Sequence, residues 1–201
     1  METTFTQLSQ LDRPGLIRLS ALHSAVMHTL LADLGQPIVL RYYECAQTDP
    51  TVIGFCAISA AGELDGWAIG CADPAALFKK LRQPPAWFAG QMLRLTITRP
   101  ATLINLISSL FSDSEPNLLS PGQIELTYIG VSAQAQGRGI GKAMLNAFLE
   151  ASLQAGYASA VISVEIENLS AIRLYTRTGF KITKTFREGQ FERHRMERDL
   201  L

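Results

Sequence analysis

The sequence of 201 residues predicts one α/β domain, and three observations lead to this prediction. First, 47% of the residues are hydrophobic and 18% are charged, which fits a globular domain with a substantial core. Second, two strand-like segments, 52–59 and 64–71, flank the turn 60–63 as in an antiparallel hairpin. Third, a strand-like segment at 124–131 is followed by a glycine-rich loop and an amphipathic helix at 142–154.

Two helices are expected before the hairpin. Apolar residues recur at helical spacing over 18–34, and a second helix is expected over 37–47, where an Asp-Pro pair ends it. His23 and His28 lie in the first of these helices. They are five residues apart rather than three or four, so they do not form a pair of ligands on one helix face, and we interpret them as ordinary helix residues.

The segment 73–122 separates the hairpin from the next strand and predicts two or three short amphipathic helices. Asp73 is placed to cap the first of them, and a Pro-Pro pair interrupts it. Two further apolar stretches follow at 86–97 and 101–111. The cationic residues expected on the solvated sides of these helices are Lys79, Lys80, Arg82, Arg94 and Arg99.

The apolar faces of this segment require a partner, because the segment is too apolar to be a linker. Packing on its own domain, or on a second copy of the chain in a homodimer, is the favoured interpretation. A lid over a substrate comes next. Contact with a lipid surface, which Trp87, Phe88 and the flanking cations suggest, is the least favoured, since these residues serve packing equally well.

Charge and cysteine content exclude several classes of protein. Eighteen basic and eighteen acidic residues give no net attraction to nucleic acid or to an anionic membrane, so no nucleic-acid partner is expected. Cys45, Cys56 and Cys71 are an odd number with no close pair, which indicates neither a disulfide framework nor a metal site. The chain shows neither a signal peptide nor a long apolar run. We therefore expect a cytoplasmic protein with buried free thiols.

The glycine-rich loop predicts an anion site. Its glycines leave backbone N–H groups uncovered at the start of a helix, where the helix dipole is positive, and Arg138 and Lys142 add positive charge. A P-loop is excluded because Ala143 stands where a hydroxyl is needed, and the alternating glycines do not match a dinucleotide fingerprint. Taken alone, the loop could equally be a flexible turn.

A second motif follows at 164–180. Asn168 is placed to cap a short helix, which is compatible with a ligand contact as well. Ala171, Leu174 and Tyr175 share one face of that helix, and Gly179 supplies the left-handed residue that ends it. A tyrosine on an inner helix face is more often a core residue than a catalyst.

Together these motifs resemble the acetyl-coenzyme A site of the GNAT superfamily of N-acetyltransferases, and the resemblance is specific over 125–180. It implies a mixed, mostly antiparallel sheet flanked by helices. We expect a single domain 1–201, in which the helical insertion 73–122 before the coenzyme-binding strand departs from the family pattern, because a compact member has a short turn there. The matching residues are Gln136, Gly139 and Gly141 in the loop, and Asn168, Ala171, Leu174, Tyr175, Gly179 and Phe180 in the second motif.

The resemblance also implies which residues hold acetyl-coenzyme A, with no metal. The strand at 124–131 is splayed from the next strand in this family, and its backbone pairs with the pantetheine arm. The implied pyrophosphate-binding residues are Gln136, Gly137, Arg138, Gly139, Ile140, Gly141 and Lys142. The implied pantetheine contacts are the backbone of Ile129, Gly130 and Val131, with Asn168 helping to position the coenzyme.

Two residues are implied in catalysis. Tyr175 would protonate the departing thiolate, and Glu125 would remove the proton from the attacking amine, as a glutamate on this strand does in some members. Glu125 lies opposite Leu126 on the strand unless a bulge intervenes, and strands of this family usually have one. The alternatives for Glu125 are an exposed charge at the strand start, a water chain as the base, or Glu165 and Glu167 on the neighbouring strand.

The sequence thus predicts an N-acetyltransferase that transfers the acetyl group to a primary amine by direct attack in a ternary complex. The rival prediction is a non-catalytic member of the fold that binds acyl-coenzyme A as a sensor or binds another protein. The acceptor, a small-molecule or peptide amine, is not specified by these motifs, and neither is the oligomeric state.

Overall fold

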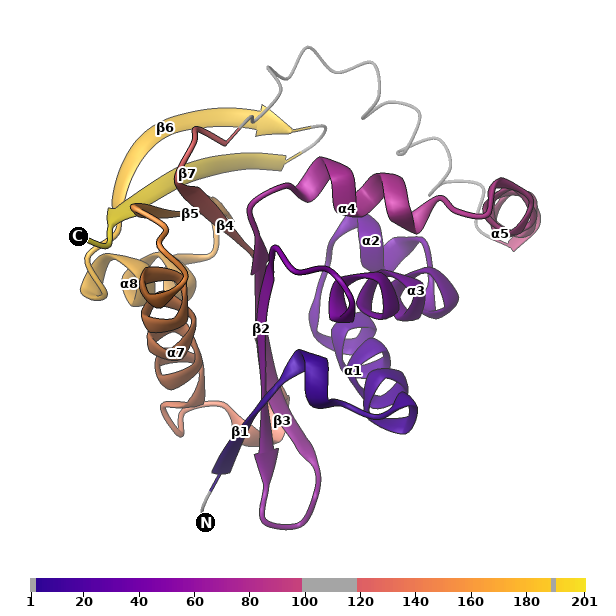
Figure 1. Cartoon of the computed structure of the whole chain (residues 1–201), viewed down its shortest axis with the longest axis horizontal. Coiled ribbons are helices and arrows are strands. Elements are labelled where there is room, and N and C mark those ends of the chain that lie inside the picture. Colours follow the sequence, from indigo (N-terminus) through magenta and orange to yellow (C-terminus); the bar gives the residue numbers. More distant parts are fainter. Residues whose placement is uncertain (1–2, 99–118, 189–190) are drawn as a thin grey trace.

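The computed structural model describes residues 3–98, 119–188 and 191–201, in which seven strands form one sheet (Figure 1). The strand order is β1-β2-β3-β4-β5-β7-β6; β4 and β5 are parallel, and every other neighbouring pair is antiparallel. The predicted mixed, mostly antiparallel sheet is therefore confirmed. The strands are β1 (Thr3–Gln7), β2 (Val52–Ser59), β3 (Leu64–Cys71), β4 (Gln123–Val131), β5 (Ser159–Glu165), β6 (Lys181–Glu188) and β7 (Phe191–Asp199).

Helices cover both faces of the sheet. Figure 1 shows α1 to α5 on one side of the central strands and α7 with α8 on the other. Two short 3-10 helices, η1 (Leu8–Gln10) and η2 (Ala133–Ala135), follow β1 and β4. The α-helices are α1 (Arg13–Val26), α2 (Leu30–Asp33), α3 (Gln36–Gln47), α4 (Pro74–Leu81), α5 (Pro85–Thr98), α7 (Ile140–Gln154) and α8 (Leu169–Arg177).

The predicted first helix over 18–34 is wrong at both ends. Helix α1 begins earlier because the Asp12 carboxylate accepts a hydrogen bond from the Gly15 N–H at 2.8 Å, which caps it. It ends at Val26, since Met27 is extended, and Thr29 caps the separate helix α2. Local capping therefore divides an apolar pattern that reads as one continuous helix.

Strands β1 and β7 were not predicted. β7 carries charges at alternate positions and so lacks the apolar alternation of a half-buried strand. It lies inside the sheet nonetheless, between β5 and β6, because its charged side chains find ionic and hydrogen-bond partners on β5 and, beyond it, on β4. Met196 is fully buried on its opposite face.

The hairpin of β2 and β3 has the predicted bounds, and the described part of the segment 73–122 contains the predicted helices. The Asp73 side chain caps α4 by accepting a hydrogen bond from the Ala76 N–H at 2.8 Å. The two prolines separate α4 from α5. The stretch predicted at 101–111, and Arg99, lie outside the described residues.

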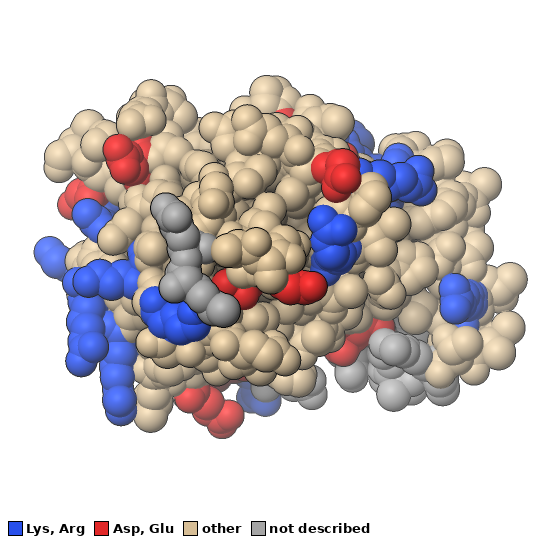
Figure 2. Space-filling model, turned by 90° about the horizontal axis from the view of Figure 1, so that it is seen from below, with Lys and Arg blue, Asp and Glu red and all other residues tan. Residues whose placement is uncertain are grey.

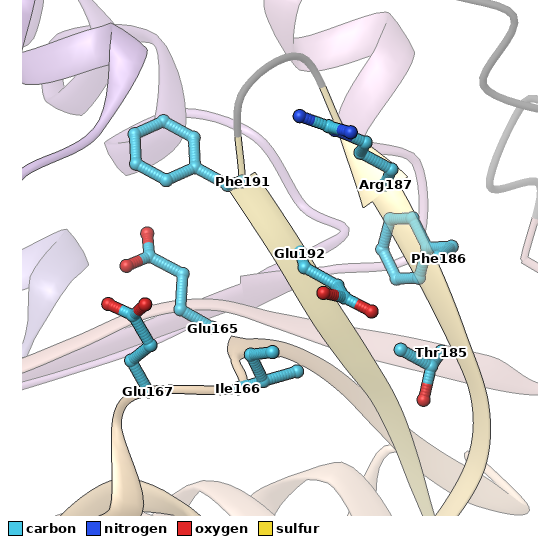
Figure 3. Close-up of a pocket in the computed structure, with 8 residues that line it drawn as sticks. All are labelled: Glu165, Ile166, Glu167, Thr185, Phe186, Arg187, Phe191 and Glu192. Carbon is cyan, nitrogen blue, oxygen red and sulfur yellow. The ribbon is translucent and has the colours of Figure 1, made fainter.

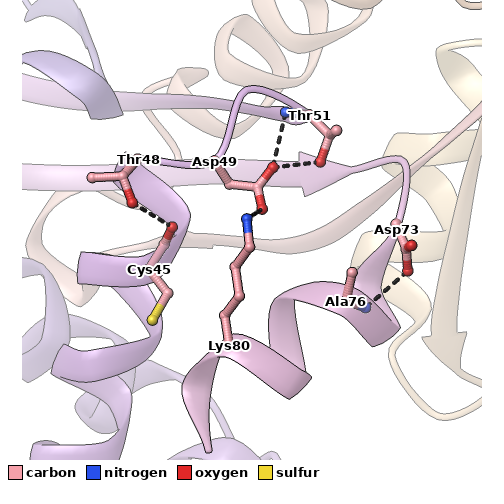
Figure 4. Close-up of polar contacts among 7 residues, drawn as sticks. All are labelled: Cys45, Thr48, Asp49, Thr51, Asp73, Ala76 and Lys80. Carbon is pink, nitrogen blue, oxygen red and sulfur yellow. Dashed lines mark hydrogen bonds and ion pairs between the residues drawn. The ribbon is translucent and has the colours of Figure 1, made fainter. Parts of the chain in front are cut away.

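Lys80 is exposed, as predicted, and its ammonium also ties α4 to the loop before β2. Its Nζ lies 2.6 Å from Oδ2 of Asp49, whose side chain is 6% exposed, and the backbone N–H and hydroxyl of Thr51 donate to Oδ1 of the same carboxylate (Figure 4). Leu77, Leu81 and Leu95 are buried in the core cluster that also contains residues of α1 and α3. The described helices of the segment thus pack, in part, on their own domain.

The core has two clusters, one on each face of the sheet. The first joins α1, α3 and α4 to β2 and β3, and the second joins α7 and α8 to β4 and β5. Cys45, Cys56 and Cys71 are buried free thiols, as predicted. Burial raises the pKa of Cys56 and of Cys71 to about 12, so both thiols are protonated at neutral pH.

His23 is more than an ordinary helix residue. It is fully buried, its Nδ1 lies 2.8 Å from the Tyr43 hydroxyl, and burial lowers its pKa to about 4. His28 lies beyond the end of α1 and is exposed. Across the described ranges, no helix is long and apolar enough to cross a membrane, and no three metal-ligating side chains gather at one place.

Candidate active site

Strands β4 and β5 separate soon after they begin. Within the described strands, three residue pairs join them, and the last is Glu125 with Val161. Of the remaining residues of β4, 126 and 128–131 pair with β3 and none pairs with β5. The backbone groups of β4 that face β5 beyond Glu125 therefore border a gap in the sheet, as the resemblance implied.

A bulge at Thr127 decides which way the side chains of β4 point. On the β3 side, Tyr128 pairs with Ile69 and Leu126 pairs with Gly70, which leaves Thr127 as the extra residue. Leu126 is buried in the cluster under α7, whereas Tyr128 packs in the cluster on the opposite face. Because the bulge follows Leu126, Glu125 and Leu126 keep opposite faces.

The gap ends at the glycine-rich loop, which is open on its outer side. Gly139 has φ of 80°, caps α7 without any side-chain hydrogen bond, and a Cβ built on it would meet no atom within 4 Å. Gly137, with φ of 76°, is equally open. The first N–H groups of any α-helix have no carbonyl partner within the helix, so the start of α7 offers hydrogen-bond donors to an anion.

The two cations of the loop differ in their attachment. Arg138 Nη1 lies 3.3 Å from Asp65 Oδ2, which ties the loop to the start of β3, whereas Lys142 is exposed on the first turn of α7. Figure 2 looks from below onto this end of the molecule and shows Lys and Arg side chains gathered at its left, on the side of α7 and α8. Gln136 is exposed, Gly141 is half-buried, and Ile140 is buried at the start of the helix.

Gly130 has a packing role. A Cβ on this residue would stand 2.4 Å from Cη2 of Trp67, whose indole is buried. The space beside its Cα is therefore filled by the tryptophan ring. Its neighbours Ile129 and Val131 pack against the cluster under α7.

Asn168 caps α8 as the sequence predicted. Its Oδ1 accepts a hydrogen bond from the Ala171 N–H at 3.1 Å and another from the Ser170 hydroxyl at 3.0 Å. The residue itself is exposed. A ligand contact by Asn168 therefore requires its amide nitrogen or its backbone rather than the capping oxygen.

Tyr175 lies in the cluster beneath α7 and α8, with 5% of its surface exposed. Its ring centroid is 5.9 Å from that of Phe180. Burial raises the pKa of Tyr175 well above its ordinary value, so the hydroxyl carries its proton at neutral pH. That is the protonation state that a general acid needs.

Glu125 is held by a residue that the sequence did not single out. Arg195 Nη1 lies 2.7 Å from Glu125 Oε1, and the same nitrogen donates to the Ser163 hydroxyl at 2.9 Å. The Arg195 and Glu125 side chains are 8% and 16% exposed. The carboxylate therefore lies in a largely buried ion pair, not at an exposed strand start.

A pocket of about 680 Å³ lies where β5 ends beside the β6–β7 hairpin. Figure 3 shows Glu165 and Glu167 extending from the end of β5 and Glu192 from β7. Arg193 lies 3.6 Å from Glu165. The lining residues are Glu165, Ile166, Glu167, Thr185, Phe186, Arg187, Phe191 and Glu192.

The two residues implied in catalysis belong to opposite faces of the sheet. Tyr175 belongs to the face that carries α7 and α8. Glu125 points to the other face, on which its strand neighbour Cys71 is buried. Glu165 and Glu167 line the separate pocket instead. Arg195 and Ser163 were missed because nothing in their local sequence marks them, since their contacts join strands that are distant in the chain.

Comparison with known proteins agrees with this geometry. The family model described as "Acetyltransferase (GNAT) family" matches residues 93–180. Two relatives are both named mycothiol acetyltransferase. The protein of Mycobacteroides abscessus is 30% identical over 179 residues, covering 85% of this chain and 56% of its own length; that of Jonesia denitrificans is 28% identical, covering 75% and 48%. The chain therefore spans about half the length of the curated relatives it matches.

Among solved structures, yncA of Salmonella typhimurium, determined with its cofactor acetyl-CoA, has a TM-score of 0.63 and 15% identity. The match covers all of this chain and 95% of that one. At this identity the likeness concerns the fold.

Proposed function

The chain belongs to the GNAT family of acetyltransferases, and from that premise we propose that it transfers an acetyl group from acetyl-coenzyme A to a primary amine by direct attack in a ternary complex. The observation that carries the proposal is the gap between β4 and β5, which runs from Glu125 to the start of α7, where the N-cap Gly139 offers no side-chain hydrogen bond. A donor with a pantetheine arm and a pyrophosphate needs such a continuous track.

The residues along this track suit the donor. The backbone of Ile129, Gly130 and Val131 can pair with the pantetheine amides, since their β5 side has no strand partner in the described residues. The open N–H groups from Gln136 to Lys142 suit the pyrophosphate. Left-handed glycines at 137 and 139 keep that loop free of side chains. Asn168 positions the coenzyme beside α8.

The catalytic roles follow from the two faces of the gap. Glu125, kept ionised beside Arg195, accepts the proton of the acceptor ammonium and so frees the amine lone pair. Tyr175, which stays protonated, donates to the leaving thiolate. Placing base and acid on opposite sides of the thioester lets the amine approach from one side while the thiol leaves toward the other.

An amine acceptor is supported by one observation. The pocket at the end of β5 carries three glutamates and one arginine, which suits a cationic molecule. The relatives named mycothiol acetyltransferase support acetyl transfer in general. We infer that the acceptor is a small-molecule amine or a peptide amine.

Thiol release measured across a panel of amines tests the proposal. We expect turnover with at least one amine and a fall of about 10²- to 10⁴-fold in kcat for Tyr175→Phe, with little change in calorimetric binding of acetyl-coenzyme A. Tyr157→Phe, which makes the same change at a tyrosine outside the site, is the control. Tight binding with no turnover on any amine would instead favour a non-catalytic sensor, and failure to bind any coenzyme A ester would refute both functions.

A further inference from the structure

The guanidinium of Arg195 joins three strands on one face of the sheet. Arg195 lies on β7, pairs in register with Ser163 on β5, and reaches past that strand to Glu125 on β4. One nitrogen, Nη1, donates to both the Ser163 hydroxyl and the Glu125 carboxylate. The arginine is 7% exposed, so this network is formed largely away from solvent.

The position of the network is specific. Glu125 is the last residue of β4 that pairs with β5, so the carboxylate is fixed at the point where the two strands part. Two neighbouring contacts of β7 differ in kind. Glu197 accepts hydrogen bonds from the uncharged Gln123 and Ser159, and Nη2 of Arg193 lies 3.6 Å from Oε1 of the half-exposed Glu165 beside the pocket. Among these described contacts, Arg195 makes the short ion pair at the gap itself.

We propose that Arg195 is a positioning residue for acetyl transfer, which holds Glu125 in one orientation and in its ionised form at the start of the gap. The inference rests on the proposed function, in which Glu125 is the base. A carboxylate beside a guanidinium gives up its charge at a lower pH than one without it. Arg195 therefore keeps Glu125 ready to accept a proton across the neutral range, and Ser163 fixes the guanidinium in turn.

Other titratable groups surround the pair, and the experiment must separate them from Arg195. Glu125 is the strand partner of the Cys71 thiol, which burial keeps protonated. The titratable groups around the pair, by element, are Cys71 on β3, Glu165 on β5, Lys184 on β6, which is the strand partner of Arg195, Arg193 and Glu197 on β7, and Asp49 near Cys71.

The pH dependence of kcat/KM tests the proposal. Removing the cation in Arg195→Gln should move the acidic limb of the profile to higher pH by roughly 1–3 units, because Glu125 then takes up its proton more readily. Arg195→Lys keeps the charge but loses the planar guanidinium with its several donors. The acidic limb of its kcat/KM profile should therefore stay near that of the wild type while kcat falls. Arg193→Gln removes a cation from the same face of the same strand and should leave the limb in place.

Stability is checked separately, because Arg195→Gln leaves a largely buried carboxylate without its cation. Thermal melting and calorimetric binding of acetyl-coenzyme A are measured for every variant. The double variant Arg195→Gln/Glu125→Gln removes both charges and should regain the folding midpoint lost in the single variant. It should also lack the acidic limb, since no carboxylate remains to titrate.

A direct titration makes the result independent of turnover. Carboxyl ¹³C resonances of glutamate-labelled protein, assigned with Glu125→Gln, report the midpoint at which Glu125 is protonated. A midpoint that rises in Arg195→Gln together with the acidic limb supports the proposal. An unmoved midpoint overturns it, and so does an unmoved limb with activity lost evenly at all pH values. If the wild type binds acetyl-coenzyme A yet acetylates no amine, the proposed function fails, while the titration still decides whether Arg195 controls Glu125.

Discussion

The indole of Trp67 on β3 lies directly against Gly130 on β4, the strand that borders the gap. A Cβ on Gly130 would stand 2.4 Å from Cη2 and 2.6 Å from Cζ3 of the ring, and the ring is buried, so it has no free space into which to withdraw. This contact couples the core under α1 and α3 to the strand whose backbone we assign to pantetheine.

Gly130→Ala should therefore destabilise the protein by about 1–3 kcal/mol, the usual cost of forcing extra volume into a packed core. Urea unfolding followed by tryptophan fluorescence measures it. Gly90→Ala on α5, where a Cβ meets no atom within 4 Å, is the matched control and should be as stable as the wild type or more stable by up to about 1 kcal/mol. Equal stability of the two variants would show that Trp67 does not restrict this position.

Gly139→Ala should weaken acetyl-coenzyme A binding by about 5- to 30-fold. The residue has φ of 80°, which costs a residue with a Cβ about 1–2 kcal/mol, and a loop that relaxes to avoid this cost no longer aims its N–H groups at the pyrophosphate. Gly62→Ala in the β2–β3 turn has the same φ and the same open surroundings. Calorimetry should show unchanged affinity for that control; a matching loss there would point to a global effect.

The contact of Lys80 with Asp49 should stabilise the fold in a pH-dependent way. Burial tends to raise the pKa of Asp49, but hydrogen bonds from Lys80 and Thr51 outweigh burial and hold the pKa below its ordinary value of 3.8. The stabilisation is thus complete above pH 3.8 and is lost as the pH falls through the lower pKa of the folded state.

Lys80→Met should accordingly cost about 1–3 kcal/mol at pH 7, because it leaves a buried acceptor short of one partner. The difference from the wild type should shrink below about pH 3.8, as chemical unfolding over a pH series can show. Lys79→Met, at the exposed neighbouring position, should have little effect at any pH. A Lys80→Met deficit that is the same at pH 3 and pH 7 would contradict the ionic interpretation.

His23 should make the fold sensitive to mild acid. Burial lowers its pKa from 6.5 to about 4, so the unfolded chain binds the proton more readily than the folded protein between these values. Stability from this group is present above pH 6.5 and is lost as the pH falls toward 4, by about 2–4 kcal/mol in all.

In His23→Phe, which cannot titrate, the free energy of unfolding should fall less steeply over this pH interval than in the wild type. The exposed His28 provides the control, since His28→Phe should keep the wild-type slope. The slopes, taken from urea unfolding at several pH values, are compared rather than the absolute stabilities, because the Phe variant also loses the hydrogen bond to Tyr43. Identical slopes in all three proteins would contradict the prediction.

Much of the fold was predictable because it depends on short-range pattern. The hairpin of β2 and β3, the strand before the glycine loop and helix α7 each follow from residues that are neighbours in the chain. The cap of Asp73 on α4 and that of Asn168 on α8 act over three residues, so the sequence shows them directly. The break between α1 and α2 was missed because capping by Thr29 competes with a continuous apolar periodicity.

By itself, therefore, the sequence determined the family motifs and the local geometry of the anion-binding loop. Tertiary structure alone decided the environment of Glu125, whose partner Arg195 lies 70 residues away. That pair exists because the strand order places β5 between β4 and β7 and because Ser163 is in register with Arg195. Register and strand order arise from the packing of the whole sheet, and no spacing of residues along one segment encodes them.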